Sequence, residues 1–126
     1  MSKGAILTKS KDFAVRIIKL TRYLQDDKHE YVLSKQIMRS GTSIGANIRE
    51  AFYAHGRADF ISKLQIALKE CYETEYWLEL LKETNYINEQ TFNDIYSLNL
   101  ELLKLLTSIV KKSKENKLSK NFKRVH

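Results

Sequence analysis

Residues 60–81, FISKLQIALKECYETEYWLELL, contain the most regular pattern in the sequence. Apolar or small residues recur there in steps of four and three. The positions are Phe60, Leu64, Ala67, Cys71, Thr74, Leu78 and Leu81. This heptad spacing places them on one face of an α-helix and is typical of helices that cross at shallow angles in a bundle. The stretch therefore predicts a long helix over about residues 58–84 inside an all-α fold.

Three further helices are expected around this one, because their apolar residues also recur at intervals of three and four. They should cover about residues 10–26, 30–54 and 88–110. Ser10 is the predicted N-terminal cap of the first. The chain has no proline and its connections are short, which favours an antiparallel up-and-down four-helix bundle over residues 1–110.

The positive charge of the chain is concentrated at its C-terminal end. The net charge of the whole sequence is +7. Residues 1–110 hold fifteen lysines and arginines against fourteen acidic residues, whereas residues 111–126 hold seven against one. We therefore expect an almost neutral bundle followed by a basic, flexible tail.

Several classes of protein are not supported by the sequence. The apolar runs are too short for a membrane span, and residues 1–9 lack a signal-peptide core, so a cytoplasmic protein without membrane contact is expected. Cys71 is the only cysteine, and no Glu-x-x-His pair of the kind that holds metals in bundles is present. We accordingly expect no metal, no cofactor and no catalytic residue.

Residues 39–50, RSGTSIGANIRE, differ in composition from ordinary helix sequence. Gly41 and Gly45 lie four residues apart, on one side of the expected helix, and predict close packing against a neighbour. Polar residues recur on another face, and buried polar groups require partners. We predict a structural polar network of Ser43, Asn47, Glu50 and, from the third helix, Glu73.

The fourth expected helix has an apolar arc of roughly 220°, wider than packing on one side requires. A second buried surface is therefore expected, most simply a subunit interface.

The basic residues suggest an interface with nucleic acid, since cations that neutralise phosphates supply most of the affinity of such complexes. The candidates are Lys11, Arg16, Lys19, Arg22, Lys35, Arg39 and Arg49 of the first two helices, and Lys111, Lys112 and Lys114 of the tail. The main hypothesis is a non-catalytic oligomer that binds RNA or DNA with weak sequence specificity. The alternative is a protein-interaction scaffold without a nucleic-acid role.

A third hypothesis concerns Arg49 and His55. An arginine followed within four to six residues by histidine, in an all-helical domain, resembles the motif of the HEPN ribonucleases. The resemblance implies that the arginine would orient a phosphate and that the histidine would assist proton transfer.

Three segments resemble a known family: SIGANIRE at residues 43–50, DFI at 59–61 and IALKECYETEYWL at 66–78. They are similar to the bacterial four-helix bundle proteins encoded in intervening sequences of 23S ribosomal RNA genes. That family in turn resembles the accessory variability determinant of diversity-generating retroelements, a five-bundle barrel that binds nucleic acid and a reverse transcriptase. The resemblance implies a homopentamer with such partners. Lys69-Glu70 stand where many members have Gly-Ser.

Overall fold

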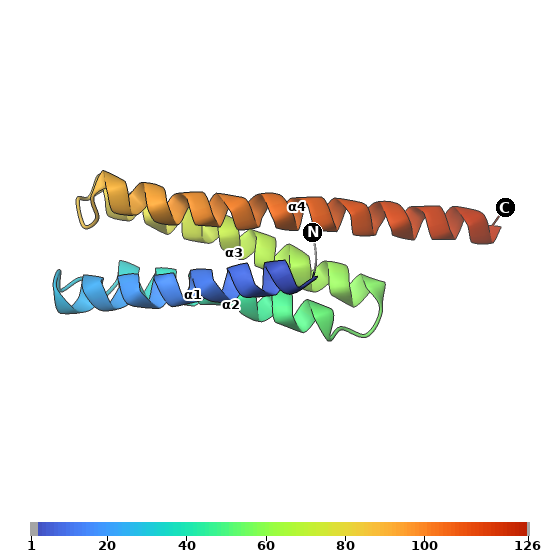
Figure 1. Ribbon diagram of the computed structural model, residues 1–126, viewed down its shortest axis with the longest axis horizontal. Helices are drawn as coiled ribbons and strands as arrows, with labels where there is room; N and C mark the ends of the chain where they lie inside the picture. The colour runs from blue at the N-terminus through green and yellow to red at the C-terminus, as the bar shows by residue number, and fades with distance from the viewer. Residues whose placement is uncertain (1–2, 126) are drawn as a thin grey trace.

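The computed structural model describes the backbone of residues 3–125 and the side chains of residues 3–116. Its four helices are α1 (Lys3–Asp26), α2 (Leu33–Phe52), α3 (Arg57–Glu83) and α4 (Glu89–Val125). Each helix packs on the next along the chain, and α4 also contacts α1, which gives an antiparallel up-and-down arrangement (Figure 1). The described residues contain no strand. The predicted all-α four-helix bundle is confirmed.

The heptad positions of α3 form the centre of the core. Leu64, Ala67, Cys71, Leu78 and Leu81 are fully buried. Phe60, at the start of the pattern, is only half-buried and its neighbour Ile61 is buried instead. The pattern therefore identified the packing face of α3 correctly except in its first turn.

The start of α1 differs from the prediction. The helix begins at Lys3, not near Ser10. Ser10 is buried, and its hydroxyl donates to the carbonyl oxygen of Leu7 instead of capping the helix. Ile6 is also buried and lies seven residues before Phe13, so the apolar face continues for two more turns.

The start of α2 is set by the side chain of Glu30, a residue that the sequence pattern places inside the helix. Glu30 precedes the first helical residue, Leu33, and its carboxylate accepts hydrogen bonds from the backbone N–H groups of Val32, Leu33 and Ser34 at 2.7–3.1 Å. This satisfies donors that a helix N-terminus otherwise leaves unpaired. The prediction of helix from residue 30 was therefore wrong by one turn.

The end of α4 was also predicted wrongly. The helix continues past residue 110 to Val125 and extends beyond the other three helices (Figure 1). Residues 111–125 contain neither glycine nor proline and are rich in lysine, so they have no strong helix breaker. The flexibility of residues 111–126 stays a prediction.

Two glycines allow α1 and α2 to approach closely. A Cβ atom added at Gly41 would lie 2.7 Å from Ile17 Cγ1, and one added at Gly45 would lie 3.3 Å from the carbonyl oxygen of Ser10. Ile17 is fully buried, so its side chain has little space into which to move. The contact fixes the relative height of the two helices along the bundle.

Candidate nucleic-acid interface

The glycine contact lies beside a groove between α1 and α2. The groove has a volume of about 410 Å³ and is lined by Leu7, Ser10, Lys11, Ala14, Thr42, Gly45, Ala46, Arg49 and Glu50. Small and apolar residues form most of its lining. Two of the predicted cations, Lys11 and Arg49, lie on this groove although they come from different helices. Glu50 is the single acidic residue among the lining residues.

Further cations lie on the exposed surface of the same two helices. Arg22 follows Lys11 by eleven residues, a spacing that returns to nearly the same side of a helix, and Lys19, eight residues after Lys11, is turned by about 80° from it. Because Gly41 packs on Ile17 in an antiparallel pair, Lys35 lies at about the height of Arg22. We call Lys11, Lys19, Arg22, Lys35 and Arg49 the α1–α2 basic face.

All five residues of the basic face are exposed. Within residues 3–116, whose side chains are described, none of them has a carboxylate within ion-pair distance. Their positive charges are therefore available to an external anion.

Arg39 behaves differently from the other candidates. Its guanidinium forms ion pairs with Glu73 and, at 3.7 Å, with Glu70 of α3. The hydrogen bond and the charge of Glu73 are the main reasons why the pKa of Arg39 is raised, and the charge of Glu70 adds to them. Arg39 therefore joins α2 to α3, and its charge is offset by two carboxylates.

The surroundings of Glu70 destabilise the charged form of its side chain. Its side chain is 12% exposed, and its Oε2 atom has no hydrogen-bond partner among the described residues. Burial raises the pKa of Glu70, and the nearby charge of Glu73 raises it further, while Arg39 and Lys69 oppose the shift.

This predicts a pH-dependent effect of Glu70→Gln. A carboxyl group whose pKa is higher in the folded than in the unfolded state stabilises the fold at low pH and loses that contribution as the pH rises through its folded pKa. The free energy of unfolding of the variant should therefore improve relative to wild type as the pH rises above about 4.3, the ordinary pKa of a glutamate side chain. Urea titrations at several pH values would measure the difference, with Glu79→Gln, at an exposed position of α3, as the matched control. A difference that moves in the opposite direction would contradict this prediction.

The structure does not join the four residues of the predicted polar network. Ser43 donates to the carbonyl oxygen of Arg39, and Asn47 donates to that of Ser43, so both bond to their own helix. Glu50 pairs with Lys63 at 3.7 Å, and Glu73 pairs with Arg39. They form separate local contacts, either within α2 or between α2 and α3.

The buried polar contacts occur at residues that the prediction did not include. Thr74 Oγ1 lies 2.9 Å from Ser40 Oγ and 2.8 Å from the carbonyl oxygen of Glu70. Asn99 of α4 donates to the carbonyl oxygen of Cys71 at 2.9 Å. Ser40, Thr74 and Asn99 are fully buried, and polar residues at core positions were the available signal in the sequence.

Cys71 lies in the core formed by α3. Burial raises the pKa of its thiol to about 12, so the reactive thiolate is not the form present near neutral pH. Among the described residues, no group of three histidine, cysteine or acidic side chains is placed to hold a metal ion.

His55 is not among the residues that line the groove on which Arg49 lies. Arg49 lines the α1–α2 groove. His55 follows the end of α2, and its backbone N–H donates to the carboxylate of Asp59. The ribonuclease hypothesis stays a prediction.

The remaining predicted cations lie elsewhere. Lys111, Lys112 and Lys114 are exposed on α4, which packs on α3 and α1. Arg16 lines a different groove, of about 430 Å³, between α1 and α4. The predicted basic residues are therefore distributed over more than one face.

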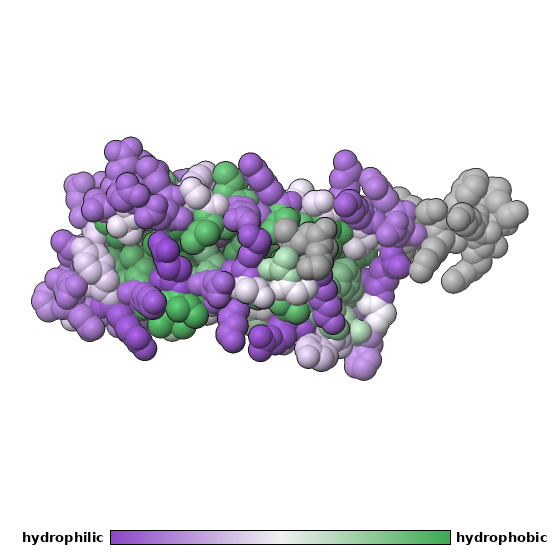
Figure 2. Space-filling model, viewed as in Figure 1, coloured by the Kyte–Doolittle hydropathy of each residue, from purple (hydrophilic) through white to green (hydrophobic). Residues whose placement is uncertain are grey.

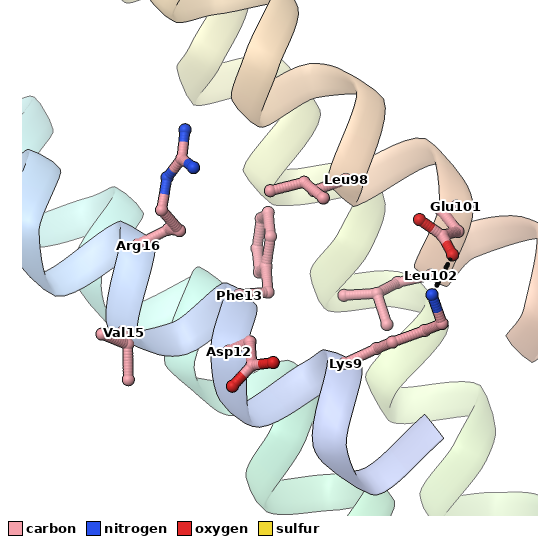
Figure 3. Close-up of a pocket in the computed structure, with 8 residues that line it drawn as sticks. All are labelled: Lys9, Asp12, Phe13, Val15, Arg16, Leu98, Glu101 and Leu102. Atoms are coloured by element: carbon pink, nitrogen blue, oxygen red, sulfur yellow. Dashed lines mark hydrogen bonds and ion pairs between the residues drawn. The ribbon is translucent and has the colours of Figure 1, made fainter. Parts of the chain in front are cut away.

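The α1–α4 groove has an apolar floor and a charged rim. Phe13, Leu98 and Leu102 lie between the two helices, and the Lys9–Glu101 ion pair bridges them (Figure 3). Figure 2 shows hydrophobic surface between hydrophilic side chains on this face of the bundle. Part of the wide apolar arc predicted for α4 lines this groove. The arc reaches the surface of the bundle there.

None of the helices in the described part of the chain has the apolar length that crossing a bilayer requires. The fold and its exposed cations define a class of helical-bundle protein with a basic surface. A family model described as 23S rRNA-intervening sequence protein matches residues 3–108, and the chain belongs to this family.

A crystal structure is closely similar to the chain. It is that of a protein of unknown function from the S23 ribosomal protein family of Bacteroides thetaiotaomicron VPI-5482. The two sequences are 56% identical over 88% of this chain and 99% of that chain, and the structures superpose with a TM-score of 0.87. No protein of curated function matches the chain.

Proposed function

We propose that the protein is a non-catalytic homo-oligomer that binds nucleic acid through the α1–α2 basic face. The observation that supports this proposal is that five exposed cations, which have no carboxylate partner within residues 3–116, lie on two adjacent helices. Lys11 and Arg22 are about 16 Å apart along the helix axis, from a rise of 1.5 Å per residue. A row of this length can contact several phosphates of one strand.

The mode of binding that this surface supports is electrostatic. Lysine and arginine contacts to phosphates position a nucleic acid without reading its bases. Lys111, Lys112 and Lys114 of α4 would add to the affinity if the strand continues over that part of the helix. Arg39 contributes little, because Glu70 and Glu73 offset its charge.

The oligomer is part of the same proposal. The apolar floor of the α1–α4 groove offers a surface for a second copy, and the family resemblance suggests five copies. A reverse transcriptase is the protein partner suggested by that resemblance.

A paired substitution tests the basic face. Lys11→Gln with Lys19→Gln should reduce the slope of log affinity against log salt by about 1.4–1.8, because each phosphate contact contributes about 0.7–0.9. Fluorescence anisotropy with labelled single-stranded and duplex RNA and DNA at several salt concentrations would measure it.

The matched control is Lys69→Gln with Lys104→Gln, which removes the same charge from exposed positions of α3 and α4. The control should retain the wild-type slope. Absence of binding by the wild-type protein even at low salt would overturn the proposal, as would equal losses in the two variants.

A scaffold without a nucleic-acid role is the second candidate, and one observation favours it. Ile66, Tyr72 and Tyr76 of α3 are exposed, at 40%, 55% and 54%, and aromatic residues are enriched at protein interfaces. Native mass spectrometry with and without RNA separates the two candidates. An oligomer that takes up no RNA would support the scaffold.

A further inference from the structure

A pocket of about 650 Å³ lies at one end of the bundle. It is formed by the end of α2, the start of α3 and the part of α4 that follows residue 110. Phe52, Arg57, Phe60, Ser113 and Asn116 line it, together with small residues. We call it the end pocket.

The end pocket contains a guanidinium group that none of the described carboxylates neutralises. Arg57 donates to the carbonyl oxygen of Ser113 at 3.4 Å, and it forms no ion pair with any residue whose side chain is described. The nearby carboxylate of Asp59 accepts a hydrogen bond from the backbone N–H of His55. Four of the donor hydrogens of an arginine thus remain for a ligand.

The electrostatic surroundings of Arg57 also favour an anion. Phe52 lines the pocket, and the ammonium group of Lys3 lies 5.2 Å from the centre of its ring. Arg57 is the first residue of α3, and no side chain caps this helix. A helix N-terminus carries partial positive charge, which adds to the charge of the guanidinium and is partly offset by Asp59.

The apolar part of the lining is aromatic. The rings of Phe52 and Phe60 are 5.6 Å apart and edge-to-face, and both side chains are only half-buried. The side-chain amide of Asn116 and the hydroxyl of Ser113 provide hydrogen-bonding groups next to them. Ala51, Ala54 and Gly56 occupy little volume and leave space for a planar group.

We propose that the end pocket binds one nucleotide unit of a single-stranded nucleic acid, with the base against the phenylalanine rings and the phosphate on Arg57. This proposal rests on the proposed function and deepens it by naming the ligand class. Only an unpaired base can leave its stack and contact aromatic side chains in this way. Arginine is suited to the phosphate, because its planar donors can bond two oxygens at once.

Titrations with small ligands test the pocket directly. Adenosine 5′-monophosphate, adenosine and ribose 5-phosphate would be titrated into the full chain and followed by NMR chemical shifts. We expect the monophosphate to bind more tightly than either part. Arg57→Gln should weaken monophosphate binding by about tenfold and leave adenosine binding nearly unchanged, since it removes one charged contact.

Two further variants make the test specific. Phe60→Leu keeps an apolar side chain of similar size and should weaken both the monophosphate and adenosine. Arg16→Gln removes the same charge from the α1–α4 groove and should change neither. Circular dichroism would verify that each variant is folded.

The outcomes separate this proposal from the proposed function. Monophosphate that does not half-saturate the wild-type protein at about 10 mM, which corresponds to a free energy of binding weaker than roughly 3 kcal/mol, would overturn the end pocket. So would binding that Arg57→Gln leaves unchanged, or equal binding of an aromatic carboxylate such as benzoate. If Lys11→Gln with Lys19→Gln reduces the salt dependence of RNA binding as expected while the monophosphate fails to bind, the proposal for the basic face is supported and the proposal for the end pocket is overturned.

Discussion

Replacing Glu30 with alanine should lower the free energy of unfolding by about 2–4 kcal/mol. The carboxylate is buried at 7% residue exposure and accepts hydrogen bonds from three backbone N–H groups. Alanine would leave these donors without their partner at the start of α2. The loss should exceed that of an ordinary N-cap because three hydrogen bonds to a charged group disappear together.

Glu50→Ala is the matched control, since it removes a glutamate from α2 itself. Glu50 is exposed and has a single ion pair, with Lys63 at 3.7 Å, so its removal should cost less than about 1 kcal/mol. Urea denaturation followed by circular dichroism would compare the two. Equal stability of the two variants would show that Glu30 is not the N-terminal anchor of α2.

Gly41→Ala should destabilise the protein by about 1–3 kcal/mol, although alanine is the better helix former. The added methyl group would lie 2.7 Å and 2.9 Å from Ile17 Cγ1 and Cγ2, and 3.2 Å from Ile17 Cβ. The Cβ atom is fixed by the backbone of α1, so rotation of the side chain cannot relieve all three contacts. The helices must move apart, at a cost greater than the gain in helix propensity.

The same substitution at Gly4 provides the control. No atom lies within 4 Å of a Cβ added there, so Gly4→Ala should be neutral or stabilise α1 by up to about 1 kcal/mol. Introducing Gly41→Ala into an Ile17→Ala background should cost much less than in wild type, because the overlapping atoms are gone. Thermal melts of the four proteins would measure this coupling, and strict additivity would refute the close contact.

The sequence predicted those parts of the fold that depend on periodic burial. The heptad of α3 identified a core face because a helix hidden along its whole length must repeat its apolar residues. The ends of the helices were harder to place. Glutamate is a good helix former, and only the position of Glu30 before Leu33 turns its carboxylate toward the backbone N–H groups that have no partner within the helix. Serine is likewise a typical N-cap residue, but the burial of Ile6 extends α1 toward the N-terminus, beyond Ser10.

The candidate site was predictable only as a set of charges. Basic residues on two adjacent helices were visible in the sequence, but their partners were not. Arg39 could be separated from the others only when α3 placed Glu70 and Glu73 beside it. Arg57 was not selected because the residues that complete its pocket, such as Ser113, lie far along the chain.

The glycine contact between α1 and α2 would link the stability of the bundle to the binding of the proposed polyanion. Lys11 and Arg49 share one groove only when Gly41 and Gly45 hold the helices together, so folding concentrates positive charge that is dispersed in the unfolded chain. The folded protein therefore carries a repulsion that an anion spanning both helices would relieve. A polyanion with this binding mode favours the native state by mass action, so that nucleic acid would serve the bundle as a folding ligand as well as a partner.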